Sequence, residues 1–318
     1  MLPLSQHHPQ WHGEITTKFP ADRVQFNIPL KPFTSFRIGG NAEVLVMPST
    51  IEEIQFLIDL ALAYKVSYRI LGHGSNLLID DKGLPGITIQ LGSSFADIHV
   101  TANTLVSQSG ASLAAVSKFA AHAALGGLAP LCGIPGSLGG AVYMNAGAYG
   151  GEISDYLFHA TVLSPSGTIL SFSKKDLCFS YRHSLLQEES FVLLDAHFSL
   201  PSGDPRQLFD EMIEFNRRRN EKQPMSLPSA GSVFKRPSGH YASKLIDDCQ
   251  LRGMQIGGAM VSPKHAGFIV NTGNATFDDV LSLIHYIQEK VFTAFQVVLE
   301  PEIRIWRTDD TTIIGGPL

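Results

Sequence analysis

The chain has 318 residues, of which 44% are hydrophobic and 17% are charged, and its formal net charge is −5. This composition excludes a disordered or fibrous chain, and the length allows one large unit or two to three domains. The net negative charge gives no broad electrostatic argument for nucleic acid, which is not expected as a partner.

Cysteine usage and the N-terminus bear on the cellular compartment. Cys132, Cys178 and Cys249 are odd in number and form no CxxC pair. This usage fits a reducing, cytoplasmic compartment better than a disulfide framework. No basic segment followed by an apolar one opens the chain, so we expect no signal peptide.

Three histidines, His7, His8 and His12, lie near the N-terminus. Imidazoles can bind a metal ion, but a polar chain end is more typical of a flexible tail. We therefore expect a tail here and no metal site.

Predicted strands and helices alternate along the chain from residue 43. The strand patterns occupy residues 43–47, 67–71, 86–91, 104–110, 161–172 (a hairpin that turns at 165–167), 190–200 and 297–306. The helix patterns occupy residues 51–64, 112–125, 205–220, 241–249 and 277–295. Thr50 with Glu53 predicts a capping box for the first helix, and Thr276 predicts an N-cap for the last. This mixture predicts an α+β fold with more than one layer.

The window from Phe119 to Gly151 contains no Asp, Glu, Lys or Arg, and its second half is rich in glycine. A membrane-spanning helix needs about 20 consecutive apolar residues. Pro130, Pro135 and the glycines interrupt this window and disfavour a helix. We therefore interpret it as a loop with short helical pieces whose backbone lies against a cofactor, and we expect no membrane contact.

A second glycine loop, GHGSNLL at residues 72–78, follows a predicted strand. The dinucleotide fingerprint G-x-G-x-x-G requires glycine where Leu77 stands, and no P-loop Gly-Lys-Ser/Thr follows. The loop can still present consecutive N–H groups to a pyrophosphate, although an ordinary tight turn is equally favoured. Together with the loop at 133–147, expected at the opposite end of the α/β region, it suits an extended diphosphate ligand such as FAD.

Several segments resemble, in order, the UDP-N-acetylenolpyruvoylglucosamine reductase family. They are TSFRIGGNAE (34–43), LGHGSNLLI (71–79), GIPGSLGGAVYMNAGAYGGEI (133–153), YRHS (181–184), PSAGSVFKRP (228–237), KHAGFIVN (264–271) and LEPEIRI (299–305). The short connection from Tyr181 to Ser232 resembles the type II subgroup, which lacks an extra substrate-covering loop.

The resemblance implies an α+β fold of the vanillyl-alcohol-oxidase/PCMH type, in which two α/β subdomains bind FAD and a third α+β domain binds substrate. The expected division is 1–85 and 86–200 for the FAD-binding subdomains and 201–295 for the substrate-binding domain. A C-terminal strand within 296–318 is expected to return to the first subdomain.

The resemblance also implies a reaction in peptidoglycan precursor synthesis. NADPH would reduce UDP-N-acetylglucosamine enolpyruvate to UDP-N-acetylmuramate through FAD. A hydride would reach the methylene carbon of the enolpyruvyl ether, negative charge would build up as an enolate, and a proton would reach the adjacent carbon. Such a site needs a cation beside the enolate and a proton donor.

Three residues match the catalytic positions of the family. Arg182 in YRHS matches the cation, Glu302 in LEPEIRI the acidic residue and Ser232 in AGSVFK the proton donor. Without the resemblance, Arg182 reads as a surface arginine and Ser232 as a strand-end hydroxyl. Glu302 would then read as half of an ion pair with Arg304. A carboxylate paired with either arginine competes with a neutral, hydrogen-bonding Glu302.

Other positions are expected to contact the cofactor or the substrate. The expected FAD-binding residues are Gly72, Gly74, Ser75, Asn76, Leu77, Gly110, Gly133, Pro135, Gly136, Ser137, Gly139, Gly140, Ala141, Asn145, Gly147 and Val192. Lys235 and Arg236 offer cations to the UDP diphosphate, with a solvated basic pair as the alternative. Tyr149 is expected beside flavin or substrate, and a core tyrosine is about as favoured.

Two rival classes share the glycine loops. A flavin-dependent alcohol oxidase would lack the Ser232 and Glu302 motifs, and a catalytically inactive nucleotide-binding module would lack one of the three catalytic residues. Since Arg182, Ser232 and Glu302 are all present, we expect an FAD-containing oxidoreductase. Its expected partner is the small-molecule substrate alone, with the enzyme acting as a monomer.

Overall fold

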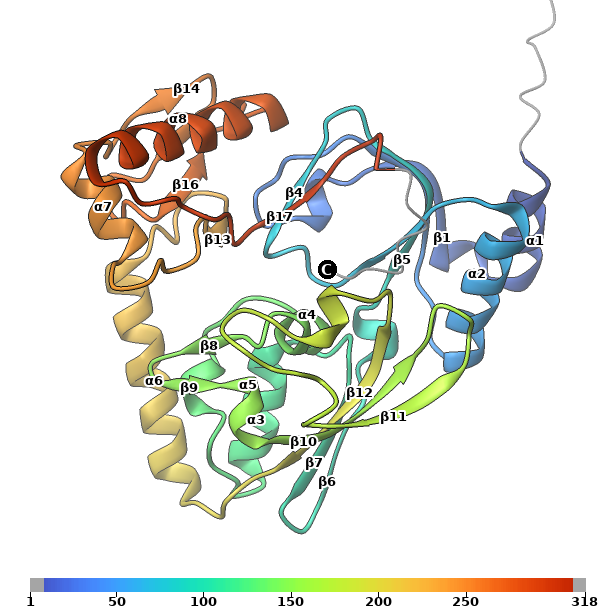
Figure 1. Cartoon of the computed structure of the whole chain (residues 1–318). Coiled ribbons are helices and arrows are strands. Elements are labelled where there is room, and N and C mark those ends of the chain that lie inside the picture. The colour runs from blue at the N-terminus through green and yellow to red at the C-terminus, as the bar shows by residue number, and fades with distance from the viewer. Residues whose placement is uncertain (1–8, 311–318) are drawn as a thin grey trace, which may run out of the picture.

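The computed structural model of the chain describes residues 9–310. Its strands form three main sheets, and each sheet has its own helices (Figure 1). The third unit, coloured orange to red, lies beside the other two, and β17 and β4 run near the middle of the view (Figure 1). Among the described residues, no helix combines the length and the apolar character that crossing a bilayer requires.

The first unit is a four-stranded sheet in the order β1-β2-β5-β3. β1 and β2 pair antiparallel, whereas β5 pairs parallel with both β2 and β3. Its elements are α1 (Gln10–Lys18), β1 (Val24–Pro29), β2 (Asn41–Val46), α2 (Ile51–Tyr64), β3 (Tyr68–Leu71), β4 (Leu77–Ile79) and β5 (Leu84–Gln90), with short 3₁₀ turns at Ala21–Arg23 and Lys31–Phe33. Thr50 caps α2 as predicted, because its side chain accepts a hydrogen bond from the Glu53 N–H. The predicted capping box is incomplete, because the Glu53 side chain accepts from Ser49 N–H at 2.7 Å instead of from Thr50 N–H.

The second unit is an antiparallel five-stranded sheet in the order β11-β10-β12-β7-β6. Its elements are β6 (Ile98–Thr101), β7 (Thr104–Gln108), α3 (Leu113–His122), α4 (Leu138–Tyr143), β8 (Gly147–Ala148), β9 (Gly151–Glu152), α5 (Ile153–Tyr156), β10 (Leu157–Leu163), β11 (Ile169–Ser173) and β12 (Val192–Ser199), with 3₁₀ turns at Ser93–Phe95, Ala129–Leu131 and Leu185–Gln187. The charge-free window is a set of loops around α4, as predicted.

The third unit follows α6 (Pro205–Lys222), the long helix that joins it to the second unit (Figure 1). Its four-stranded sheet has the order β13-β16-β15-β14. The elements are β13 (Ser229–Ser232), α7 (Ala242–Asp248), β14 (Gln255–Ile256), β15 (Ala259–Val261), β16 (Phe268–Asn271) and α8 (Phe277–Phe295). Buried side chains of α8, including Val280, Ile284 and Ile287, share one hydrophobic core with this sheet.

The chain returns to the first unit through β17 (Arg304–Trp306), which pairs parallel with β4. The predicted strand over 297–306 was therefore wrong for residues 297–303, which bridge two units through isolated contacts instead of joining a sheet. Trp306 is buried beside Leu77 and Leu30, and this packing anchors the returning segment.

Two N-terminal expectations need correction. His12 lies in α1 rather than in a tail, and it is buried with its Nε2 atom 3.2 Å from Glu43 Oε1. His7 and His8 lie outside the described residues. β1 was not predicted, because its exposed positions outnumber its single buried one and blur the alternation of a strand.

The division into domains remains our proposal, with one change. The expected boundary between residues 85 and 86 falls inside β5, whose partners β2 and β3 both belong to the first sheet. We propose that the first unit extends through Gln90, which leaves each sheet intact.

Candidate active site

Two glycine loops lie next to each other at the junction of the first and second units. One follows β3 and the other precedes α4. Ser75 Oγ of the first loop donates a hydrogen bond of 2.8 Å to Pro135 O of the second. A Cβ atom on Gly136 would lie 2.8 Å from the same hydroxyl. The expectation that the loops lie at opposite ends was wrong, because they form one continuous surface.

Glycine occupies the positions of this surface for two different physical reasons. A Cβ atom on Gly74 would lie 2.1 Å from Phe33 O, and one on Gly110 would lie 2.4 Å from Gly92 O. These positions exclude side chains because the chain packs against itself. Gly140 differs, since within the described residues its Cβ position has one neighbour closer than 4 Å, Ser137 Oγ at 3.6 Å. A side chain there is excluded by no part of the chain, which is what a ligand-facing glycine requires.

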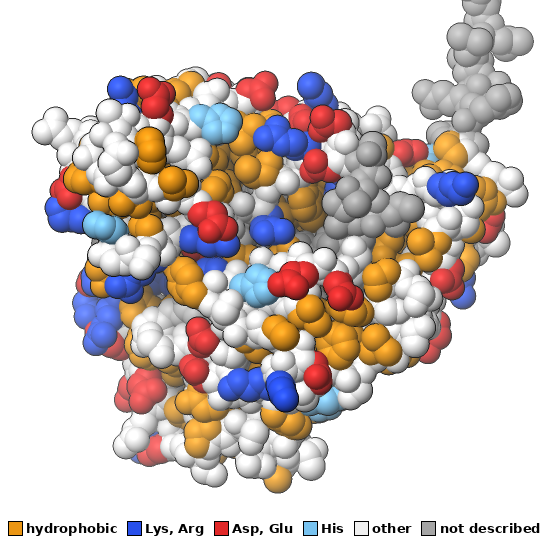
Figure 2. All heavy atoms as spheres, in the orientation of Figure 1, with side chains coloured by type: hydrophobic (Ala, Val, Ile, Leu, Met, Phe, Trp, Pro, Cys, Tyr) orange, Lys and Arg blue, Asp and Glu red, His pale blue; other side chains and the backbone are white. Residues whose placement is uncertain are grey.

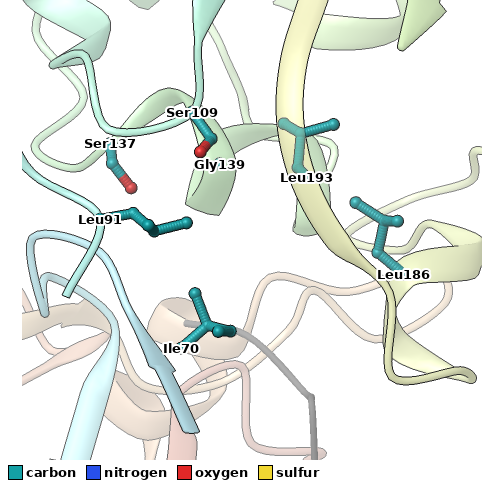
Figure 3. Close-up of a pocket in the computed structure, with 7 residues that line it drawn as sticks. All are labelled: Ile70, Leu91, Ser109, Ser137, Gly139, Leu186 and Leu193. Atoms are coloured by element: carbon teal, nitrogen blue, oxygen red, sulfur yellow. The ribbon is translucent and has the colours of Figure 1, made fainter. Parts of the chain in front are cut away.

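A narrow pocket lies where β3, β7, α4 and β12 converge (Figure 3). Its polar end carries the hydroxyls of Ser109 and Ser137, and its remaining lining is Ile70, Leu91, Gly139, Leu186 and Leu193. Ser109 Oγ is buried and has no hydrogen-bond partner within residues 9–310. The pocket volume of about 10 Å³ suits about one water molecule, so the cavity itself does not hold a cofactor.

The predicted FAD-binding residues fall into three groups. Gly72, Gly74, Ser75, Asn76, Gly133, Pro135, Gly136, Ser137, Gly139 and Gly140 belong to the two touching loops and the start of α4. Gly110 packs beside them, Gly147 accepts a hydrogen bond from Arg182, and Ala141 is buried in α4. Leu77, Asn145 and Val192 are fully buried, and their side chains belong to the interior.

The side chain of Asn145 is not available to bind FAD, because other residues already occupy its hydrogen-bonding groups. Its Nδ2 donates to Glu152 Oε1 at 3.0 Å and to Ser180 O at 3.1 Å, and its Oδ1 accepts from Ser154 N at 3.0 Å. These bonds occupy both N–H groups of the amide and one lone pair. The side chain therefore links α5 to the turn that carries Arg182.

Arg182 and Glu302, two of the expected catalytic residues, come from segments 120 residues apart in the chain. Arg182 Nε donates a hydrogen bond of 2.8 Å to Glu302 Oε1, and Arg182 Nη2 donates one of 3.2 Å to Gly147 O. Within residues 9–310 no hydrogen bond involves Nη1, so one edge of the guanidinium fork remains available. The reading of Arg182 as a surface arginine is therefore wrong, since its side chain is 21% exposed and ion-paired.

Glu302 is held by backbone bonds on both sides. Its N–H donates to Val233 O at 2.7 Å, and its carbonyl accepts from Asn76 Nδ2 at 3.1 Å. Burial raises the pKa of the Glu302 carboxyl above its ordinary value, although Arg182 acts in the opposite direction. The alternative pairing with Arg304 is not formed, because that guanidinium lies over the Tyr143 ring at 5.3 Å.

Ser232 ends β13, one residue before the carbonyl that holds the Glu302 backbone. It is half-buried. The preceding Gly231 has φ +79°, and no described atom lies within 4 Å of where its Cβ would be. The backbone beside the Ser232 hydroxyl thus borders open space rather than packed chain.

Lys235 and Arg236 follow on the same segment. Lys235 Nζ donates to Glu300 Oε1 at 2.6 Å and also lowers the pKa of Glu302. Arg236 lies 4.0 Å above the centre of the Tyr241 ring. Figure 2 shows acidic and basic side chains together in the middle of this face, where the third unit meets the others.

Tyr149 is 40% exposed and stacks on Phe215 of α6, with ring centres 4.9 Å apart, so it is not a core tyrosine. Next to it lies Arg219, which the sequence analysis did not single out. Arg219 is 92% buried, its Nε has no hydrogen-bond partner within residues 9–310, and burial lowers its pKa. The sequence did not distinguish Arg219 from the neighbouring arginines of the same charged helix. Its burial depends on which face of the helix it occupies, and the exposed arginines beside it occupy another face.

The surface of the two loops fits FAD on two observations. The first amides of α4 are not among them, because Leu138 N–H donates to Ala111 O, Gly139 N–H to Ser109 O and Gly140 N–H to Ser137 Oγ. At Gly140 a Cβ atom would have one neighbour within 4 Å in the described chain, Ser137 Oγ at 3.6 Å, which leaves room for a ligand. Ser109 supplies a buried hydroxyl without a partner in the described chain.

Comparisons with known proteins agree with this geometry. The model described as "FAD binding domain" matches residues 42–173, and that of the UDP-N-acetylenolpyruvoylglucosamine reductase C-terminal domain matches 223–306. The reductase of that name from Caldanaerobacter subterraneus is 47% identical over 89% of this chain and 93% of its own, and the one from Listeria monocytogenes is 47% identical over 92% and 98%. The crystal structure of UDP-N-acetylenolpyruvylglucosamine reductase from Thermus caldophilus is 35% identical, with a TM-score of 0.77 over 89% of this chain and 99% of its own. The predicted FAD-binding α+β fold is thereby confirmed, and the chain belongs to the UDP-N-acetylenolpyruvoylglucosamine reductase family.

Proposed function

We propose that this chain reduces UDP-N-acetylglucosamine enolpyruvate to UDP-N-acetylmuramate with Arg182, Glu302 and Ser232 as its catalytic residues. The observation that carries this assignment is the 2.8 Å pair between Arg182 and Glu302, whose backbone N–H donates to the carbonyl of Val233, the residue that follows Ser232. Bound FAD supplies the hydride, which originates from NADPH.

Arg182 holds the carboxylate of the enolpyruvyl group. Its free Nη1 edge is available for the substrate, while Nε and Nη2 are fixed by Glu302 and Gly147. Hydride addition moves negative charge onto the carboxylate side, so the attraction to the guanidinium grows as the reaction proceeds. An interaction that strengthens in this way lowers the barrier rather than merely tightening binding.

Glu302 acts as a neutral carboxyl that donates a hydrogen bond to the enolate oxygen. The raised pKa of this buried group supports the neutral form. The ion pair with Arg182 favours the opposite, ionised form, and the enolate of the substrate would compete for the same guanidinium. Proton uptake by Glu302 is therefore coupled to the arrival of a second negative group at Arg182.

Ser232 gives its hydroxyl proton to the carbon next to the new C–H bond and regains a proton before the next turnover. A serine hydroxyl is a weak acid, so the transfer requires a strongly basic enolate-like carbon and a fixed geometry. The open space beside Gly231 supports access to a substrate at this position.

Cations beyond the catalytic pair suit the nucleotide end of the substrate. Lys235, Arg236 and Arg219 offer positive charge to a diphosphate, and Tyr149 offers an exposed ring beside Arg219. A buried guanidinium without a full set of partners gains more from an anionic ligand than a solvated one does. We also propose a monomeric, cytoplasmic enzyme, and the three free cysteines of the described residues support the cytoplasmic assignment.

The test follows NADPH oxidation by the purified, FAD-loaded protein with and without UDP-N-acetylglucosamine enolpyruvate. We expect rapid, substrate-dependent oxidation and formation of UDP-N-acetylmuramate. A protein that shows no flavin absorbance after incubation with FAD, or that oxidises NADPH at the same rate without substrate, would contradict the proposal. A flavin-dependent alcohol oxidase would instead consume an alcohol and leave the enolpyruvyl ether unchanged.

A further inference from the structure

The turn that carries Arg182 has a demanding backbone. Arg182 has φ +55°, in the left-handed region that non-glycine residues rarely occupy. Ser180 and His183 exchange backbone hydrogen bonds of 3.1 and 3.2 Å across it. The left-handed region is unfavourable for a residue that carries a side chain, so the surrounding structure must hold this turn in place.

Two side-chain amides supply that hold. Asn145 Nδ2 donates to Ser180 O, and Gln187 Nε2 donates to Arg182 O at 2.9 Å. The same Gln187 amide donates to Tyr143 O, the last residue of α4, at 2.8 Å. The two N–H groups of the Gln187 amide therefore connect the carbonyl of Arg182 to the end of α4.

The two amides differ in what else depends on them. Asn145 is fully buried and also bonds to Glu152 and Ser154, so its loss would disturb α5 as well as the turn. Gln187 is half-buried on the 3₁₀ turn Leu185–Gln187. Besides the two carbonyls, its amide touches Met144 Sδ at 3.8 Å. Its side chain therefore concerns the Arg182 turn and little else.

We infer that Gln187 is a positioning residue for the reaction, which acts by fixing the backbone of Arg182 relative to α4 and thereby aims the guanidinium fork at the substrate carboxylate. This inference rests on the proposed role of Arg182. The fork binds a carboxylate well in a narrow range of directions. A turn free to relax would keep the charge near the site but lose that direction.

The test compares Gln187→Met with Gln55→Met in the FAD-loaded protein. Gln55 is a matched control, because its Nε2 also donates a 2.8 Å hydrogen bond to a turn carbonyl, that of Gly167 in the distant β10–β11 hairpin. A displacement of about 1 Å at a reacting group can cost about 10²-fold in rate. We expect Gln187→Met to lower kcat by about 10-fold and to raise KM several-fold, with both values unchanged in Gln55→Met.

A purely structural role for Gln187 predicts a different pattern. It would lower the thermal midpoint of unfolding without acting through Arg182. We expect the effect of Gln187→Met on substrate affinity, measured from the flavin absorbance, to disappear in an Arg182→Met background, since coupled residues are non-additive. Equal losses in both backgrounds, or equal kcat values in Gln187→Met and Gln55→Met, would overturn the inference.

Folding and function can be separated within the same experiment. If Gln187→Met does not fold, Gln187→Glu keeps the shape of the side chain, loses both donors and should give the same kinetic loss. An inactive wild-type protein would overturn the proposed function, whereas the inference on Gln187 would still be decided by the affinities in the two backgrounds.

Discussion

The two members of the proposed catalytic pair are held in different ways. Glu302 is held mainly through backbone atoms, because its N–H donates to Val233 O and the nearby Arg304 N–H donates to Asn76 O, while one side chain, that of Asn76, donates to its carbonyl. The Arg182 turn has the backbone bonds between Ser180 and His183 and depends in addition on two side chains, those of Gln187 and Asn145. Backbone bonds survive most substitutions, so we infer that the Arg182 side of the site is the more easily damaged by mutation elsewhere.

The two sides also differ in how charge is controlled. Arg182 supplies a guanidinium, the side-chain group that proteins use for permanent positive charge. Glu302 can change state, since burial raises its pKa while Arg182 and Lys235 lower it. One side therefore supplies constant charge and the other a group that gains or loses a proton with its surroundings.

The largest expected effect lies on the Glu302 side, at Ser232. Ser232→Ala should still allow NADPH to reduce bound FAD, because that half-reaction needs no proton from Ser232. Turnover of the enolpyruvyl substrate should fall by about 10²–10⁴-fold, the usual contribution of a general acid. Stopped-flow absorbance separates the two half-reactions. Ser229→Ala, on the same strand, is the matched control, and equal activity in both variants would remove Ser232 from the mechanism.

Arg182→Lys tests the constant-charge side. Lysine keeps the positive charge but lacks the planar fork, so we expect kcat to fall by about 10- to 100-fold and KM to rise. Arg23→Lys is the matched control, because Arg23 also forms a fork to a carboxylate, with bonds of 2.7 and 2.8 Å to Glu53, away from the site. A raised KM with unchanged kcat would mean that Arg182 only binds substrate.

Substitutions of Glu302 test the side of the site whose protonation state can change. If the neutral form is active, activity falls as pH rises through the pKa of Glu302, and the raised pKa moves that fall above the ordinary carboxyl range. Glu302→Gln retains a donor and should keep activity within about 10-fold of wild type, with the alkaline fall absent. Glu302→Ala should lose more. Rate–pH profiles of the three proteins decide the matter, and a Gln variant as inactive as the Ala variant would indicate that the carboxylate positions its neighbours instead.

The helices and the main strands were predictable because local signals specify them. Thr50 and Thr276 cap their helices as expected, and alternating or apolar runs mark β10 and β12. Residues 297–303 were misread because the short apolar run 297–299 looks the same whether it pairs with strands or bridges two units.

Long-range contacts were the part of the site that the sequence could not predict. The resemblance placed Arg182, Ser232 and Glu302 in named roles, but the pairing of Glu302 with Arg182 rather than Arg304 depends on how three units pack. The same holds for Gln187 and Arg219, whose importance arises from a turn and from burial that no local pattern records. The residue type alone did not indicate a role for Gln187 or for Arg219.

The smallest expected effect concerns the glycine loops that support both sides, and it compares Gly140→Ala with Gly110→Ala. Among residues 9–310, a methyl group on Gly140 has one neighbour within 4 Å, Ser137 Oγ at 3.6 Å, and alanine is favoured over glycine within α4 by roughly 1 kcal/mol. The protein without FAD should therefore fold at least as stably as wild type, while its affinity for FAD should fall about 10-fold. On Gly110 the same methyl would lie 2.4 Å from both Gly92 O and Phe95 O, so the fold itself should be destabilised. Thermal unfolding without FAD and FAD titration by fluorescence separate the two outcomes. If Gly140→Ala binds FAD as tightly as wild type, the open space at that position does not face the cofactor, and the second loop must contact FAD through other atoms.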